Sequence, residues 1–176
     1  MRRYCIMKVV FRAFACILLI ALLTGCSLPA PDPGNRRLAY LTPPAHFCGT
    51  LEYAGELYHA AIDMTESGNF SLMLSGEGPL AGFGFLHNAD GWRISCGNDE
   101  YLCPISNDSL AGTYLTFVSL TEDCLISSEK SNNGETAVYS KNGTDFTLTF
   151  DSTGTLVRTE TENSVFKHET FNVREE

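Results

Sequence analysis

Basic side chains are scarce in this sequence of 176 residues. It holds 12 Lys and Arg against 21 Asp and Glu, which gives a formal net charge of −9. Four of the basic residues (Arg2, Arg3, Lys8 and Arg12) stand near the start of the chain, where no acidic residue occurs. Affinity for nucleic acids comes largely from Lys and Arg that displace the counterions of phosphate groups. The charge balance therefore argues against a nucleic-acid partner.

The motifs of common catalytic sites are also missing. The chain has no G-x-S-x-G nucleophile turn, no H-E-x-x-H zinc motif and no glycine-rich phosphate loop. Its histidines stand in separate segments with no recurring carboxylate neighbour: His46, His59, His87 and His168. We therefore expect a noncatalytic protein that uses no cofactor and no metal.

Long apolar runs are absent as well. The run from Ala13 to Leu23 is uncharged, but a permanent membrane helix needs about 20 apolar residues. Basic residues, a short apolar stretch and then small residues are typical of a secretory signal peptide, here residues 1–25, with translation starting at Met1 or Met7. Removing 25 of the 176 residues leaves 151, enough for one domain, and removing the four basic residues changes the formal net charge from −9 to −13.

The end of this leader carries a lipid-attachment pattern. Leu23, Thr24, Gly25 and Cys26 resemble the lipobox of bacterial lipoproteins, in which an apolar and two small residues precede a cysteine. The resemblance implies cleavage before Cys26 and lipid on its thiol, so that the protein is held on the outside of the cell membrane without a transmembrane helix. In a bacterium with two membranes, Ser27 after the cysteine implies the outer membrane.

A proline-rich segment follows the lipidated cysteine. Residues 26–45 contain Pro29, Pro31, Pro33, Pro43 and Pro44. Proline fixes φ and has no amide donor, so we expect an extended, partly stiff tether. The folded domain is then expected at residues 46–176.

Turn residues recur along this domain at intervals of about 8 to 12 residues, and apolar residues alternate between them. The turns are Ala54-Gly55, Glu66-Ser67-Gly68, Asn88-Ala89-Asp90-Gly91, Asn142-Gly143 and Ser152-Thr153-Gly154. The pattern predicts an antiparallel meander of roughly ten strands. We expect the last strand, Ser164 to Val173, at a sheet edge, because Lys167 and Glu169 interrupt its apolar face.

Residues 107–125 depart from this alternation. Their apolar side chains stand near helical spacing, after Asn107 or Asp108 as a cap: Leu110, Tyr114, Phe117, Val118 and Leu125. A sheet with one apolar face needs a cover. We therefore predict an α+β fold, a curved antiparallel sheet covered by this single helix.

Three short motifs support this fold by resemblance. Residues 51–55 (LEYAG), 78–83 (GPLAGF) and 92–96 (WRISC), followed by the helix and short strands, resemble uncharacterised lipoproteins of Gram-positive bacteria. Those in turn look like the Lol-type half-barrel of periplasmic lipoprotein carriers, whose concave side holds acyl chains. The resemblance, which covers roughly Phe47 to Asn172, implies that this chain binds a lipid or another apolar ligand.

The aromatic side chains leave two interpretations open. Phe83, Phe85, Trp92, Tyr114 and Phe117 either line a ligand cavity between sheet and helix or form the core. If there is no cavity, the alternative function is a protein-interaction or envelope-scaffold module that uses its acidic face or an exposed sheet edge.

Four cysteines fall in the expected domain: Cys48, Cys96, Cys103 and Cys124. Exported domains can carry disulfides. Cys96 and Cys103 could lie opposite each other in a hairpin, and Cys48 with Cys124 would then join the first strand to the helix end. Free buried thiols are the alternative, and a metal site is disfavoured because no C-x-x-C pair occurs.

Overall fold

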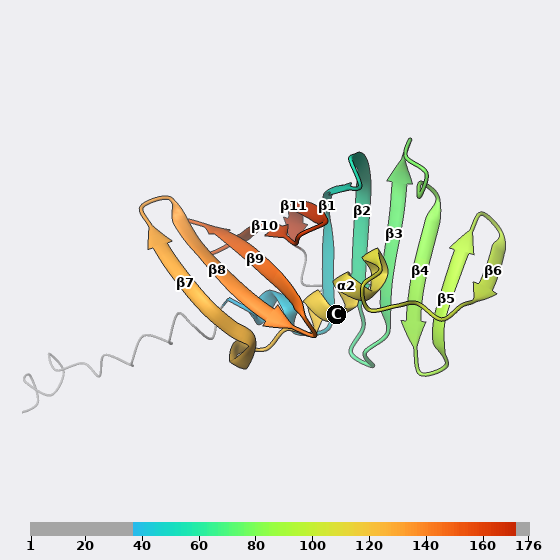
Figure 1. The fold of residues 1–176 in the computed structure, drawn as a ribbon, viewed down its shortest axis with the longest axis horizontal. Helices are drawn as coiled ribbons and strands as arrows, with labels where there is room; N and C mark the ends of the chain where they lie inside the picture. The colour runs from blue at the N-terminus through green and yellow to red at the C-terminus, as the bar shows by residue number, and fades with distance from the viewer. Residues whose placement is uncertain (1–36, 172–176) are drawn as a thin grey trace, which may run out of the picture. The chain divides into compact units, whose positions relative to one another are not determined.

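The computed structural model of the protein describes residues 37–171, which lie within one compact unit (Figure 1). The expected signal peptide, the lipobox-like residues and the start of the expected tether lie outside the described residues. Six strands come first: β1 (Ala45–Tyr53), β2 (Glu56–Met64), β3 (Phe70–Gly76), β4 (Phe83–Asn88), β5 (Gly91–Cys96) and β6 (Asp99–Leu102). Five more follow helix α2 (Leu110–Val118): β7 (Leu125–Ser131), β8 (Gly134–Lys141), β9 (Thr144–Asp151), β10 (Leu156–Glu160) and β11 (Ser164–Phe171).

All 11 strands belong to one sheet, in the order β6-β5-β4-β3-β2-β1-β11-β10-β9-β8-β7, and neighbours pair antiparallel. The sheet is open, because the edge strands β6 and β7 do not pair with each other. Figure 1 shows β7 to β9 steeply inclined to β2 to β5, as twist in a large sheet requires. The expected α+β fold, with roughly ten antiparallel strands and one helix, is confirmed for the described residues.

Short turns set the register of the hairpins. Asn142 and Gly143 between β8 and β9 have φ of 54° and 81°, and Ala54 and Gly55 between β1 and β2 have 53° and 81°. Positive φ at both central positions is the geometry of a type I′ turn, which matches the twist of the flanking strands. The turn residues read from the sequence therefore lie where the chain reverses.

The last strand is not an edge strand, so that expectation is wrong. β11 lies between β1 and β10 and joins the two meanders in the middle of the sheet. The two strands approach closely at Gly49, next to a register shift between β1 and β11, because a Cβ there would lie 1.9 Å from the carbonyl oxygen of Lys167. Lys167 and Glu169 are exposed on the face that meets solvent, and a central antiparallel strand can carry charges on such a face.

Helix α2 is shorter than the sequence predicts. Ser109, and not Asn107 or Asp108, caps it, because the Ser109 hydroxyl oxygen accepts a hydrogen bond from the Gly112 amide at 3.1 Å. The helix ends at Val118, where Lys141 Nζ donates to the Ser119 carbonyl oxygen. A 3-10 turn, η3 (Glu122–Cys124), follows, and Leu125 opens β7 instead of extending the helix.

We call the face of the sheet that α2 covers the inner face and the opposite face the outer face. Alternate side chains of β1 to β3 and β8 to β11 point inward and pack against the helix. The ring centroids of Phe47 and Phe117 are 5.9 Å apart, and those of Tyr114 and Phe166 are 5.8 Å apart. The core of the protein is thus the layer between α2 and the centre of the sheet.

The folded part begins before residue 46, within the stretch that we expected to be tether. A 3-10 turn, η2 (Ala39–Leu41), precedes β1, and Leu41 is buried in the core. Arg37 forms an ion pair of 2.5 Å with Glu135 of β8. The Leu38 and Leu41 side chains explain the difference, because they give this segment apolar surface to bury.

Candidate functional site

The centre of the inner face is filled with side chains. Tyr114 and Phe117 of α2 are both 0% exposed, and the Phe117 ring lies 6.2 Å from that of Phe146. The Tyr114 hydroxyl is 3.3 Å from Ser164 Oγ, and burial raises the pKa of Tyr114. These two candidate ligand-lining residues are therefore part of the core.

His168 belongs to the same filled layer. Its ring lies 4.4 Å from that of Phe166, and its Nε2 is 2.8 Å from the hydroxyl of Thr159. Burial lowers the pKa of His168 to about 3, because the charged form would lose its hydration. At neutral pH the side chain is an uncharged ring packed among aromatics.

The other three candidate residues lie beyond the helix, on β4 and β5. The register places Phe85, Ile94 and Tyr101 side by side on the inner face, and Phe83 and Trp92 share that face. We call these five residues the aromatic wing: Phe83, Phe85, Trp92, Ile94 and Tyr101. Tyr101 is 60% exposed and the other four are half-buried. The sheet therefore presents an apolar surface that the core does not fully use.

The wing is continuous with the core on one side and reaches the sheet edge on the other. The Phe83 and Phe85 rings stack with centroids 6.4 Å apart, and Trp92 packs edge-on against Phe70 of the core at 5.9 Å. Figure 1 shows the segment between β6 and α2 returning across the inner face in front of these strands. Its Ile105 packs on the core. The geometry suits contact with an apolar ligand, because the wing presents aromatic and aliphatic surface.

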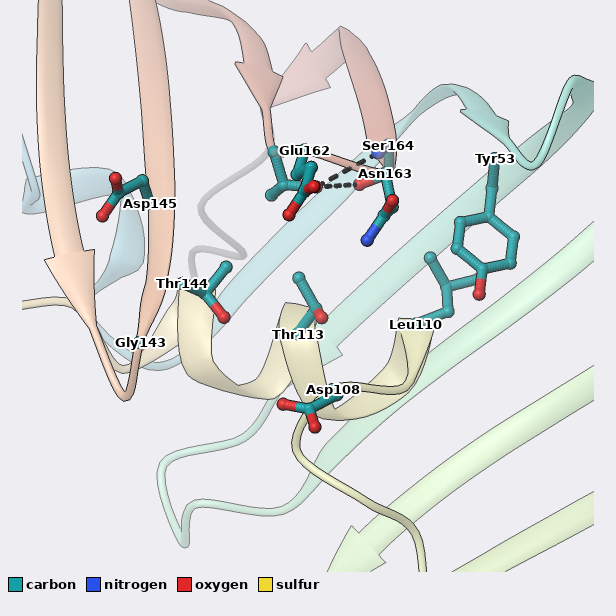
Figure 2. A pocket seen from close by; sticks show the side chains of 11 residues that line it. Tyr53, Asp108, Leu110, Thr113, Gly143, Thr144, Asp145, Glu162, Asn163 and Ser164 are labelled. Atoms are coloured by element: carbon teal, nitrogen blue, oxygen red, sulfur yellow. Dashed lines mark hydrogen bonds between the residues drawn. The ribbon is translucent and has the colours of Figure 1, made fainter.

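A hollow with a volume of about 310 Å³ lies at the start of α2 (Figure 2). It is lined by the end of β1, the first turn of α2, the β8–β9 turn and the β10–β11 turn: Tyr53, Asp108, Leu110, Thr113, Gly143, Thr144, Asp145, Thr161, Glu162, Asn163 and Ser164. Three carboxylates and no Lys or Arg stand in this lining. An acyl chain or an anion would meet unfavourable surroundings there. No sequence pattern pointed to this hollow, because its residues come from turns far apart along the chain.

The cysteine pairings expected from the sequence are not formed, and the four cysteines within residues 37–171 are free. A two-residue turn, Gly97-Asn98, places Cys96 opposite Asp99, and the Cys103 amide bonds the Trp92 carbonyl. Cys96 and Cys103 are thus offset by four residues, or about 13 Å along a strand. Cys48 points to the outer face, whereas Cys124 packs against the core on the inner face.

One histidine has a carboxylate partner that the sequence did not reveal. His46 of β1 and Asp63 of β2 are cross-strand neighbours, and their Nδ1 and Oδ1 atoms are 2.5 Å apart. They are 17 positions apart in sequence, so only the register of the hairpin brings them together. His59 lies on the same outer face, because it stands two residues before Ala61, which faces Cys48 across the strand pair. His87 instead lies on the inner face, where its ring packs beside that of Trp92.

Among residues 37–171, no group of three or more His, Cys, Asp and Glu side chains is arranged to hold a metal ion. In the same part of the chain, no helix combines the length and the apolar character needed to cross a bilayer.

Neither a known family model nor a curated protein matches the sequence. Among solved structures, the chain is similar to a LolA superfamily protein from Nitrosomonas europaea, with a TM-score of 0.45 and 10% sequence identity. The match covers 82% of this chain and 93% of that one. At this level of similarity, the function of that protein is not transferred to this chain.

Proposed function

We propose that this chain is a lipid-anchored, extracytoplasmic and noncatalytic protein that binds an acyl chain, or a ligand of similar apolar character, on the aromatic wing. The observation that carries the proposal is the contrast within one sheet face. Its centre is filled, while its β4–β6 end keeps four half-buried apolar side chains and an exposed Tyr101. A ligand would lie across the wing and not beneath α2.

The chemistry of the wing supports an apolar ligand. Burial of apolar surface contributes about 25 cal/mol per Å², so a contact of about 300 Å² would contribute about 7.5 kcal/mol before the cost of association. Rings on neighbouring strands offer an extended surface suited to a chain-like ligand. Because the surface is open on one side, we expect weak and reversible binding.

The lipobox residues Leu23 to Cys26 support the anchored location. Lipid on Cys26 would hold the folded unit near a membrane. Ten residues, 27–36, separate Cys26 from the first described residue, and ten residues reach at most about 35 Å. The wing would then stay within a short distance of the membrane surface, where acyl chains are available.

Membrane fractionation tests the anchored location, and energy transfer from Trp92 tests ligand binding, because Trp92 is the only tryptophan of the sequence and stands in the wing. The full chain is compared with Cys26→Ser, which lacks the attachment thiol. Wild-type protein is expected in the membrane fraction and the variant outside it. The soluble variant is then titrated with a dansyl-labelled fatty acid, and saturable transfer from Trp92 to dansyl is expected.

Two further substitutions in the Cys26→Ser chain locate the binding site. Phe83→Ser removes a wing ring and is expected to weaken binding at least tenfold. Leu57→Ser is the matched control, because Leu57 is 62% exposed but lies on the outer face, opposite Glu52. Equal loss of binding in both variants, or no saturable transfer at all, would overturn the ligand-binding role.

A protein-interaction role is the second candidate, and the open sheet edges favour it. Most of β7 is exposed, including Ile126 at 61%, and an edge strand offers unpaired backbone groups to another chain. Crosslinking that maps to β7 on one partner, with no fatty-acid binding in the titration, would select this role over ligand binding.

A further inference from the structure

The outer face of β1 and β2 carries a chain of three polar side chains. Cys48 Sγ lies 2.9 Å from His46 Nε2, and His46 Nδ1 lies 2.5 Å from Asp63 Oδ1. His46 and Cys48 are two residues apart on β1 and so point to the same side, and Asp63 faces His46 across the strand pair. The order carboxylate, imidazole, thiol is that of a nucleophile with an oriented base.

We propose that Cys48 is a modification site that forms a mixed disulfide with low-molecular-weight disulfides, with His46 as the base and Asp63 as the residue that positions it. In this step the Cys48 thiol gives its proton to His46 Nε2 while Sγ attacks one sulfur of the small disulfide. The S–S bond of that disulfide breaks, and its leaving thiolate takes the proton from His46. The products are Cys48 joined to one half of the reagent and one free small thiol.

The surroundings of Cys48 explain why it needs a base. Burial, then the charges of Asp63 and Glu169, raise the pKa of the Cys48 thiol. The thiol is therefore protonated at neutral pH, and the thiolate is the attacking form. An imidazole within hydrogen-bond reach can accept the proton as the attack proceeds, and a carboxylate on its other nitrogen fixes the tautomer that allows this.

The strand geometry favours exchange at sulfur over acyl transfer. Acyl transfer needs donors aimed at a developing oxyanion, and β1 pairs with β2 on one side and β11 on the other, so its ladder amides are already used. Disulfide exchange develops no oxyanion. The other described cysteines lie elsewhere, on the inner face or beyond β6, so the mixed disulfide would persist instead of passing to a neighbouring thiol.

The test measures reaction of the full chain with 4,4′-dithiodipyridine, an uncharged disulfide, and follows each cysteine by peptide mass spectrometry. His46→Gln and Asp63→Asn are each expected to slow the reaction at Cys48 at least tenfold at pH 7, with Cys96, Cys103 and Cys124 unchanged. His59→Gln is the matched control, an exposed histidine on the outer face of β2. It is expected to leave the rate at Cys48 within twofold of wild type.

A pH profile separates a base from a merely structural residue. Titratable and charged side chains lie beside Cys48 on three strands: His46 on β1, Asp63 and His59 on β2, and Lys167 and Glu169 on β11. An unaided thiol loses about tenfold in rate for each unit below its pKa. From pH 8 to 6 the reaction rate at Cys48 is expected to fall much less than the rate at Cys103. In the His46→Gln variant, the rate at Cys48 is expected to fall as steeply as the rate at Cys103.

Rates at Cys48 that match wild type in both His46→Gln and Asp63→Asn would overturn the proposal. So would parallel pH profiles for Cys48 and Cys103 in the wild-type chain, a readout that needs no variant. A folding defect in either variant would speed the reaction at Cys48, Cys96, Cys103 and Cys124 together. The pH profile of the wild-type chain then decides whether His46 acts as the base. Because the site lies on the outer face, these outcomes are independent of fatty-acid binding by the aromatic wing.

Discussion

The centre of the inner face and its β4–β6 end share one sequence pattern but differ in burial. Under α2, inward residues such as Phe47 and Phe146 have no exposed surface. In the aromatic wing, Phe83 and Phe85 alternate in the same way along their strand but stay half-buried. Alternation decides which face a side chain takes, while the nine residues of α2 decide how much of that face is covered. Position relative to the helix therefore separates core from candidate binding surface.

Substituting one phenylalanine in each region gives the largest expected difference. Phe117→Ala leaves a cavity in the filled centre and is expected to lower the free energy of unfolding by about 3 to 5 kcal/mol. Phe83→Ala removes a half-buried ring from the wing, so we expect less than half of that loss. Urea unfolding of both variants measures the difference, and equal losses would contradict the division of the inner face into two regions.

His168 provides the next test, because it is a titratable group inside the filled centre. Its folded pKa of about 3 lies below the ordinary value of about 6.5, so the unfolded chain binds more protons between these two pH values. Stability is therefore expected to fall as pH decreases through this window, by about 2 kcal/mol from pH 6.5 to pH 4.5. His168→Gln keeps a hydrogen-bonding group toward Thr159 but does not titrate there. Its unfolding free energy should change less over the same interval, and an unchanged pH dependence would show that another group is responsible.

Local sequence rules predicted most of the sheet. Positive-φ turns such as Asn142-Gly143 and alternating strands such as Phe70 to Leu74 depend on neighbours in sequence, and these predictions held. The position of β11 in the sheet was not predicted, because its pairing with β1 brings together two parts of the chain that are far apart in sequence. The expected Cys96–Cys103 pairing failed for a related reason, since a two-residue turn shifts the register of the whole hairpin.

The candidate sites were only partly visible in the sequence. Phe83, Phe85 and Trp92 were singled out as aromatic, but their separation from Tyr114 and Phe117 required the position and length of α2. The Asp63–His46–Cys48 chain could not be found without the β1–β2 register, although His46 and Cys48 do share an i, i+2 spacing on a strand.

The smallest expected effect concerns the residue where the helical cover begins. Ser109 accepts from the Gly112 amide, so Ser109→Ala leaves that amide without its cap and is expected to cost about 1 kcal/mol of unfolding free energy. Ser109→Asn keeps a capping oxygen and is the matched control, with an expected change of a few tenths of that value. Hydrogen exchange of residues 110–113 follows the first turn directly. If α2 sets the boundary of the covered region, Ser109→Ala should speed exchange there and leave the amides of β5 unchanged, whereas equal acceleration in both would mean that the helix and the wing unfold as one unit.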